Sequence, residues 1–171
     1  MGRVHIAHTI GSVRQTGEYD CWAASLAMVA GQRHGRHLWV SDIRRIAADA
    51  HVGLDSYGAL RRDDAANAQR LANALGLRFH NLRATSFDIP LIERLLRPGR
   101  LAILGDFEYS GVQRFHVIAV YRLFGDETGP GTTVSLIDPS VGRYTNMAWN
   151  RFYDADEGRS FLVDPHFVIG H

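Results

Sequence analysis

The sequence changes character at Gly99, and this change limits the folds that are open to the chain. Before it, apolar residues recur at the spacing of amphipathic helices. After it, runs rich in Val, Ile and aromatic residues alternate with glycine- or acid-rich turns, as in antiparallel strands. This pattern predicts an α+β fold. With 171 residues we expect one domain, 1–171, with a helical half at about 12–100 and a β half at about 101–171.

Capping residues and apolar periodicity predict four helices in the first half. The first begins at Cys21, directly after its expected N-cap Asp20, and its small alanines suit close packing in the core. One short strand is expected in the same half, and four more follow in the second half. The expected helices cover residues 21–31, 41–50, 64–75 and 88–97, and the expected strands cover 77–80, 101–104, 115–124, 132–137 and 160–163.

Composition and charge exclude several classes of protein. Nineteen basic and eighteen acidic residues leave a net charge of +1, which gives no electrostatic attraction to nucleic acid or to an anionic membrane. The apolar runs at 21–24 and 117–121 are far shorter than the roughly 18 residues of a membrane span. Residues 1–11 contain no apolar core of a secretory signal, so any export is expected to use another route.

The sequence gives no sign of a metal or cofactor site. Cys21 is the only cysteine, which excludes an internal disulfide and a thiolate zinc site. His34 and His37 have the spacing of a metal-binding pair, but Gly35 weakens a helix there and no carboxylate completes the set, so we expect a solvated loop. Other polar residues are expected at the surface, namely His5, His8, His166 and His171 near the termini, and Arg44-Arg45 and Arg61-Arg62 on solvated helix faces.

The polar loop from Gln15 to Asp20 leads directly into the first helix, which places Cys21 at the helix start. Unpaired N–H groups and the positive end of the helix dipole favour an anion there, so this thiol is expected to react as a thiolate nucleophile. The same N–H groups, together with the side-chain amide of Gln15, would bind the oxyanion of a tetrahedral intermediate.

A thiolate nucleophile needs an imidazole to pair with it and to protonate the leaving group, and a third group to orient the ring. His116 is the best candidate, because it lies at the start of the expected strand 115–124. Asp138 ends the next strand, so two neighbouring antiparallel strands would bring the two side chains together. The alternative is that Asp138 is only a turn residue before Pro139, with Asn146 and Asn150 as the next candidates for the third group.

These residues, in this order, resemble the papain-like cysteine peptidases: Gln15, the Cys21-Trp-Ala helix start, His116 followed by Val-Ile-Ala-Val, and Asp138. The Asp138-Pro139 ending and the small size look most like the peptidase domains of bacteriocin-processing transporters and the papain-like effector proteases of pathogenic bacteria. The resemblance implies a cleft between a helical lobe and a β lobe. It also implies Cys21 as nucleophile, His116 as general acid and base, Asp138 as orienting group and Gln15 as oxyanion donor.

The implied activity is cleavage of a protein or peptide substrate. The resemblance suggests a bacterial effector or toxin, delivered into a target cell, whose producer would need an immunity protein. All 19 basic residues are Arg. A GC-rich genome would explain this, and so would selection against the amines that accept ubiquitin in a foreign cytosol. A deamidase, a transglutaminase or a cell-wall amidase with the same triad remains open, as does an inactive peptide-binding pseudoenzyme.

Overall fold

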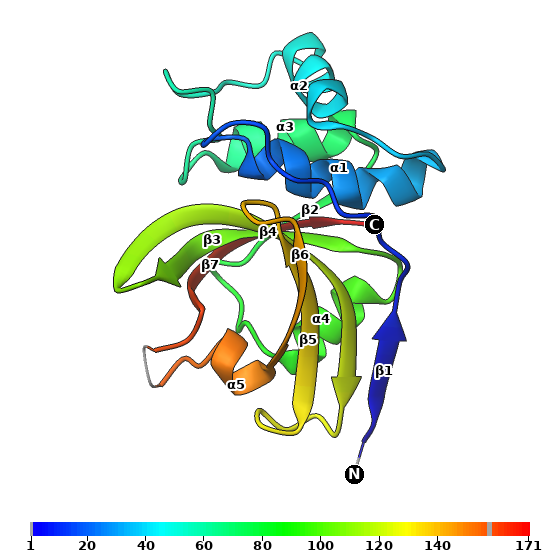
Figure 1. Cartoon of the computed structure of the whole chain (residues 1–171), viewed down its shortest axis with the longest axis vertical. Coiled ribbons are helices and arrows are strands. Elements are labelled where there is room, and N and C mark those ends of the chain that lie inside the picture. Colours follow the sequence, from blue (N-terminus) through cyan, green and yellow to red (C-terminus); the bar gives the residue numbers. More distant parts are fainter. Residues whose placement is uncertain (1, 157–158) are drawn as a thin grey trace.

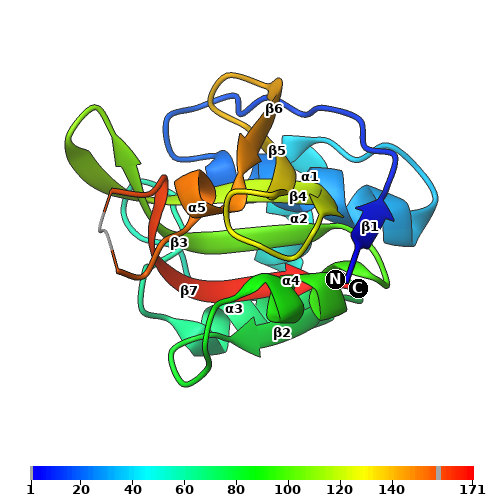
Figure 2. The same ribbon diagram turned by 90° about the horizontal axis from the view of Figure 1, so that it is seen from below.

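Within residues 2–156 and 159–171, which this computed structural model describes, the chain forms a seven-stranded antiparallel sheet (Figure 1). The strand order is β2-β7-β3-β4-β5-β6, and β1 pairs with the end of β4 that β3 leaves free. Figure 2 shows this order across the sheet, from β2 at one edge to β6 at the other. The strands are β1 (Val4–Ala7), β2 (Arg78–Asn81), β3 (Leu101–Tyr109), β4 (Val112–Gly125), β5 (Thr132–Asp138), β6 (Arg143–Ala148) and β7 (Leu162–Gly170).

Helices cover both faces of the sheet (Figure 1). One face carries α1, α2 and α3, and the core between them includes Trp22, Leu26 and Val117. The opposite face carries α4 and α5, with Ile92, Phe152 and Ile118 in its core. The helices are α1 (Cys21–His34), α2 (Val40–Asp49), α3 (Ala65–Ala74), α4 (Ile89–Leu96) and α5 (Trp149–Phe152).

The mixture of helices and antiparallel strands agrees with the predicted α+β class, and the four predicted helices are present. Local chemistry explains their ends. The carboxylates of Asp64 and Asp88 accept hydrogen bonds from the N–H groups of Asn67 and Leu91, so they cap α3 and α4. Gly35, at a φ of 62°, ends α1 in the left-handed conformation that glycine adopts at low cost.

The strands differ more from the prediction. β7 runs to Gly170 instead of ending at residue 163, and β1 and β6 were not expected. Pro165 interrupts the apolar pattern of β7, and the strand accommodates it where its pairing with β3 shifts register. β6 is an edge strand with exposed or half-exposed side chains, so it lacks the apolar alternation that marks a strand in a sequence.

Two expectations about surface residues are wrong. His166 is only 2% exposed, because β7 carries it beneath the turn that precedes α3. Arg61 and Arg62 lie in that turn and not on a helix face, and Arg62 pairs with Asp106 at 2.9 Å. Among the helices in the described part of the chain, none combines the length and the apolar character needed to cross a bilayer.

Candidate active site

Cys21 is the first residue of α1 and is 9% exposed. Asp20 precedes it at the N-cap position, but its carboxylate does not cap the helix, contrary to the prediction. Instead it accepts hydrogen bonds from Thr16 Oγ1 at 2.6 Å and from Arg44 Nε at 2.8 Å. Arg44 is therefore an ion-pair partner and not simply a solvated residue. The first N–H groups of α1, beside the thiol, thus remain free of a side-chain cap.

Two hydrogen bonds, one buried and one half-buried, fix α1 against its surroundings. Ser25 Oγ, one turn after Cys21, donates to the carbonyl oxygen of Val117 on β4 at 2.9 Å. Trp22 Nε1 donates to the carbonyl oxygen of Gly58 at 3.1 Å, which ties the loop before α3 to the same helix. Because Val117 follows His116, the first bond sets the position of the nucleophile candidate relative to the imidazole.

His116 lies on β4, with Phe107 and Tyr109 packed edge-on against its ring. Its Nε2 atom lies 2.8 Å from Asp138 Oδ1. Burial alone would lower the pKa of His116, but hydrogen bonds and charge interactions with Asp138 and Cys21 outweigh it and raise the pKa to about 9. Since Nε2 contacts Asp138, Nδ1 is the ring nitrogen left for the Cys21 thiol.

Asp138 is held by several donors in addition to His116. Its Oδ1 accepts from the Ser140 N–H at 2.9 Å and from Ser140 Oγ at 2.7 Å, and its Oδ2 accepts from Tyr109 Oη at 2.6 Å. Burial raises the pKa of this carboxyl, but the His116 ring and these hydrogen bonds bring it well below its usual range. The carboxylate therefore stays ionised beside a protonated ring at neutral pH.

A pocket of about 400 Å³ opens beside the thiol and the imidazole. Most of its wall is apolar or aromatic, which suits the side chain of a bound peptide. Trp22 forms part of this wall as well as part of the core. The lining residues are Gln15, Glu18, Tyr19, Cys21, Trp22, Ala59, Leu60, Tyr109, Arg114, Phe115, His116, Val117 and Ser140.

The family model described as the papain-like cysteine protease AvrRpt2 matches residues 4–157. The chain belongs to this family. It is a cysteine peptidase, and the resemblance drawn from the sequence is confirmed. None of the curated proteins matches the chain. The matched range includes Gln15, Cys21, His116 and Asp138, the four residues that the sequence singled out.

Sequence reasoning missed two residues of the peptidase that contact Asp138, namely Tyr109 and Ser140. The contact with Ser140 could have been predicted locally, because an Asp side chain often accepts a hydrogen bond from the N–H group two residues later and so forms an Asx turn. Asp138 is thus a turn residue and a partner of His116 at once. Tyr109 left no signal, because it reaches Asp138 only through the pairing of β3 with β4 and of β4 with β5.

Gln15 lies beside this turn, since its N–H donates to the carbonyl oxygen of Pro139 at 2.9 Å. Its side-chain Nε2 donates to the carbonyl oxygens of Gly17 and Glu18, at 2.9 and 3.1 Å. An oxyanion role therefore requires one of these amide hydrogens to turn into the pocket.

Asn146 and Asn150, the alternatives for the third group, line a different pocket of the peptidase. The Asn146 side chain accepts a hydrogen bond from Ser135 Oγ at 2.6 Å. Of the three candidates for this role, only Asp138 contacts the His116 ring. His34 and His37 are exposed, as expected, but His34 is the last residue of α1 and not part of a loop.

Proposed function

We propose that the peptidase cleaves protein substrates with Cys21 as nucleophile, His116 as general acid and base and Asp138 as the group that orients the ring. One observation carries the proposal: a buried imidazole that contacts the carboxylate of Asp138 lines the same pocket as the thiol at a helix start, and Cys21 contributes to raising the pKa of that ring. The elevated pKa of His116, about 9, keeps the ring protonated at neutral pH, as pairing with a thiolate nucleophile requires.

In the first step the Cys21 thiolate attacks the carbonyl carbon of the scissile amide and forms a tetrahedral oxyanion. When the C–N bond breaks, His116 transfers its proton to the leaving amine, and Cys21 retains the acyl group as a thioester. Neutral His116 then takes a proton from water, whose oxygen attacks the thioester. Collapse of the second intermediate returns the sulfur as thiolate and His116 as imidazolium.

We place the oxyanion beside the start of α1. The N–H groups there lack a side-chain cap, because Thr16 and Arg44 hold the Asp20 carboxylate aside. Gln15 would add one amide hydrogen after releasing the carbonyl oxygen of Gly17 or Glu18. The substrate cleft then lies between the α1 layer and the strands that carry His116 and Asp138.

The substrate is expected to place an apolar side chain in the pocket, against Trp22, Leu60 and Phe115. We propose further that the peptidase acts as a bacterial effector or toxin on a protein of a target cell. The effector family and the Arg-only basic residues support this assignment. An immunity protein in the producing cell would follow from a self-toxic activity.

The test is mass spectrometry of a target-cell proteome incubated with wild-type protein or with Cys21→Ala. New peptide termini that appear only with the wild type support the proposal. Deamidated or cross-linked glutamines without new termini would instead indicate a deamidase or a transglutaminase, which share the thioester step. An unchanged proteome, combined with capture of intact peptides, would indicate a binding protein.

A further inference from the structure

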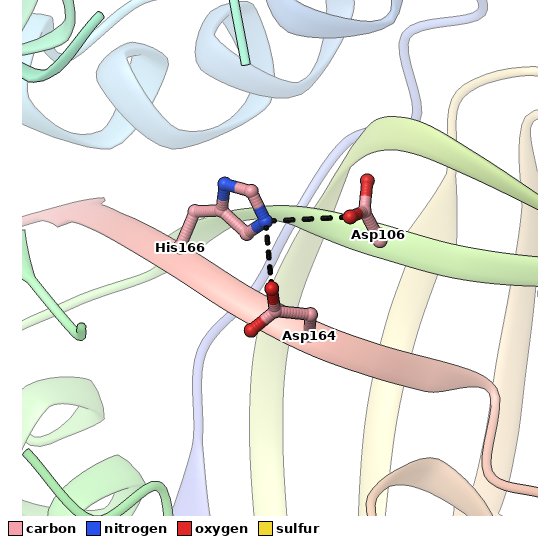
Figure 3. Close-up of side chains that lie close together, drawn as sticks. All are labelled: Asp106, Asp164 and His166. Carbon is pink, nitrogen blue, oxygen red and sulfur yellow. Dashed lines mark ion pairs between the residues drawn. The ribbon is translucent and has the colours of Figure 1, made fainter. Parts of the chain in front are cut away.

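A second cluster of ionisable side chains lies outside the pocket, where β3 and β7 pair (Figure 3). Asp106 of β3 and Asp164 of β7 are register partners, and His166 comes after Pro165, the residue next to Asp164 on β7. His166 Nε2 lies 3.2 Å from Asp164 Oδ2 and 3.5 Å from Asp106 Oδ2, and one ligand atom from each of the three residues lies within 4.8 Å of the other two. Gly105 permits this approach, because a Cβ there would meet the Asp164 carbonyl oxygen at 2.5 Å.

The protonation of His166 follows from its surroundings. Its Nδ1 atom lies 3.2 Å from the carbonyl oxygen of Arg62, which can only accept, so Nδ1 carries a hydrogen. In a neutral ring Nε2 is then an unprotonated acceptor. That atom is buried, has no hydrogen-bond donor and points at two carboxylate oxygens (Figure 3). Lone pairs of three acceptors facing one another repel, so with a neutral ring the arrangement favours a bound cation at its centre.

We propose that His166, Asp106 and Asp164 bind a divalent transition metal of the zinc type. Two ligands each about 2.1 Å from a tetrahedral zinc ion are about 3.4 Å apart, close to the two nitrogen–oxygen distances here. One imidazole with two carboxylates suits zinc better than magnesium or calcium, which prefer oxygen ligands alone. The Nδ1 hydrogen bond to a backbone carbonyl is the usual outer support of a metal-binding histidine.

The surrounding charges also suit a divalent cation. Asp63 adds a third carboxylate, 3.9 Å from His166 Nδ1. Arg62 pairs with Oδ1 of Asp106 and leaves Oδ2 directed at the ring, while Arg83 pairs with Asp63. Within residues 2–156 and 159–171, no arginine pairs with Asp164, whose side chain is 67% exposed. Its exposed carboxylate gives the metal an entry path and leaves room for water as a fourth ligand.

Such a metal would join β3 and β7, and through His166 Nδ1 it would also hold the turn that contains Arg62. This turn directly follows Ala59 and Leu60 of the pocket wall. Phe115 lies between the two sites, since it packs on the His166 ring and also lines the pocket. The metal therefore has a structural role, and none of its three ligands lines the pocket.

The test uses Cys21→Ala protein stripped of metal with a chelator, because the thiol and imidazole of the pocket can themselves bind zinc. Calorimetric titration with zinc chloride is expected to give one site per chain. Adding Asp164→Asn should weaken binding at least about tenfold, whereas the control Asp49→Asn, at an exposed position at the end of α2, should leave it unchanged.

The melting temperature and the absorption spectrum with cobalt provide two further tests. Zinc should raise the melting temperature of the Cys21→Ala protein but not that of Cys21→Ala/Asp164→Asn, and excess magnesium should not compete. Cobalt should give the visible absorption of a tetrahedral site only where Asp164 is present. An absence of zinc binding, or binding that Asp164→Asn leaves unchanged, overturns the proposal and leaves a protonated His166 paired with two carboxylates.

Discussion

Replacing Asp138 separates the charge of this side chain from its geometry. Asp138 Oδ1 accepts three hydrogen bonds, one from His116 and two from Ser140, and Oδ2 accepts one from Tyr109. In Asp138→Asn the amide oxygen is expected to take the Oδ1 position, where every partner is a donor. The amide nitrogen then faces Tyr109 Oη, whose hydroxyl can rotate its hydrogen away and accept instead. The ring of His116 thus keeps its acceptor without the negative charge.

The size of the expected loss in kcat/KM can be estimated from the pKa of His116. The pKa of His116 rises from 6.5 to about 9, which corresponds to roughly 3 kcal/mol in favour of the charged ring. Asp138 and Cys21 both contribute to this stabilisation of the protonated ring. Neutralising Asp138 therefore removes on the order of 1 to 2 kcal/mol of it and lowers kcat/KM about tenfold. Asp138→Ala also removes the acceptor that orients the ring, and we expect it to lower kcat/KM by about a thousandfold.

The assay is steady-state cleavage of a substrate found in the proteome experiment, with circular dichroism to confirm that both variants fold. The order of the two variants matters more than the size of either effect. Equal losses in Asp138→Asn and Asp138→Ala would mean that the charge alone matters. Wild-type activity in both would leave Asp138 as a turn residue and refute its role at the ring.

Three further predictions follow from the contacts of the site. Ser25→Ala should destabilise the protein by about 1 kcal/mol in urea unfolding, because it removes the buried hydrogen bond to the carbonyl oxygen of Val117. An unchanged midpoint would show that this bond does not hold α1 in place. Tyr109→Phe should lower kcat/KM severalfold in the wild type and less in an Asp138→Asn background, where Tyr109 no longer donates to a carboxylate; equal effects in both backgrounds would contradict the contact. The pKa of His116 is higher in the folded state, so the contribution of this ring to stability is complete below about pH 6.5 and is lost as the pH rises through about 9. The unfolding free energy of the wild type, measured relative to that of His116→Gln, should therefore fall over this pH range. A difference that stays constant with pH would argue against the ion pair.

The parts of the fold that could be predicted from the sequence are those with local causes. Asp64 and Asp88 cap the helices that follow them, and both ends of α3 and α4 agree with the prediction to within about two residues. The contact of His116 with Asp138 could also be anticipated, because two successive strands joined by a short turn pair with each other.

The parts that could not be predicted depend on contacts between distant segments. Ser25 reads in the sequence as one more small helical residue, and only the packing of α1 on β4 gives its hydroxyl a partner. His166 seemed a terminal surface residue, yet the register of β3 and β7 buries it against Asp106. The proposed metal site could not be predicted from the sequence, because Asp106 lies about 60 residues before Asp164 and His166 in the chain and meets them only where the pairing of β3 with β7 shifts register.

The arrangement of Asp20 shows how the protein reconciles a stable helix with a reactive one. An aspartate at this position ordinarily stabilises a helix by about 1 kcal/mol, because it accepts hydrogen bonds from the first N–H groups. Here that carboxylate would compete with an oxyanion for the same donors and place a negative charge beside the thiolate. Thr16 and Arg44 bind the Asp20 carboxylate instead. Burial raises the pKa of Asp20, but the hydrogen bonds from these two residues outweigh burial and lower the pKa below its usual value. The carboxylate therefore stays ionised and is held away from the thiol. In the proposed mechanism, α1 therefore lacks a side-chain cap at the position where its free N–H groups would bind the oxyanion.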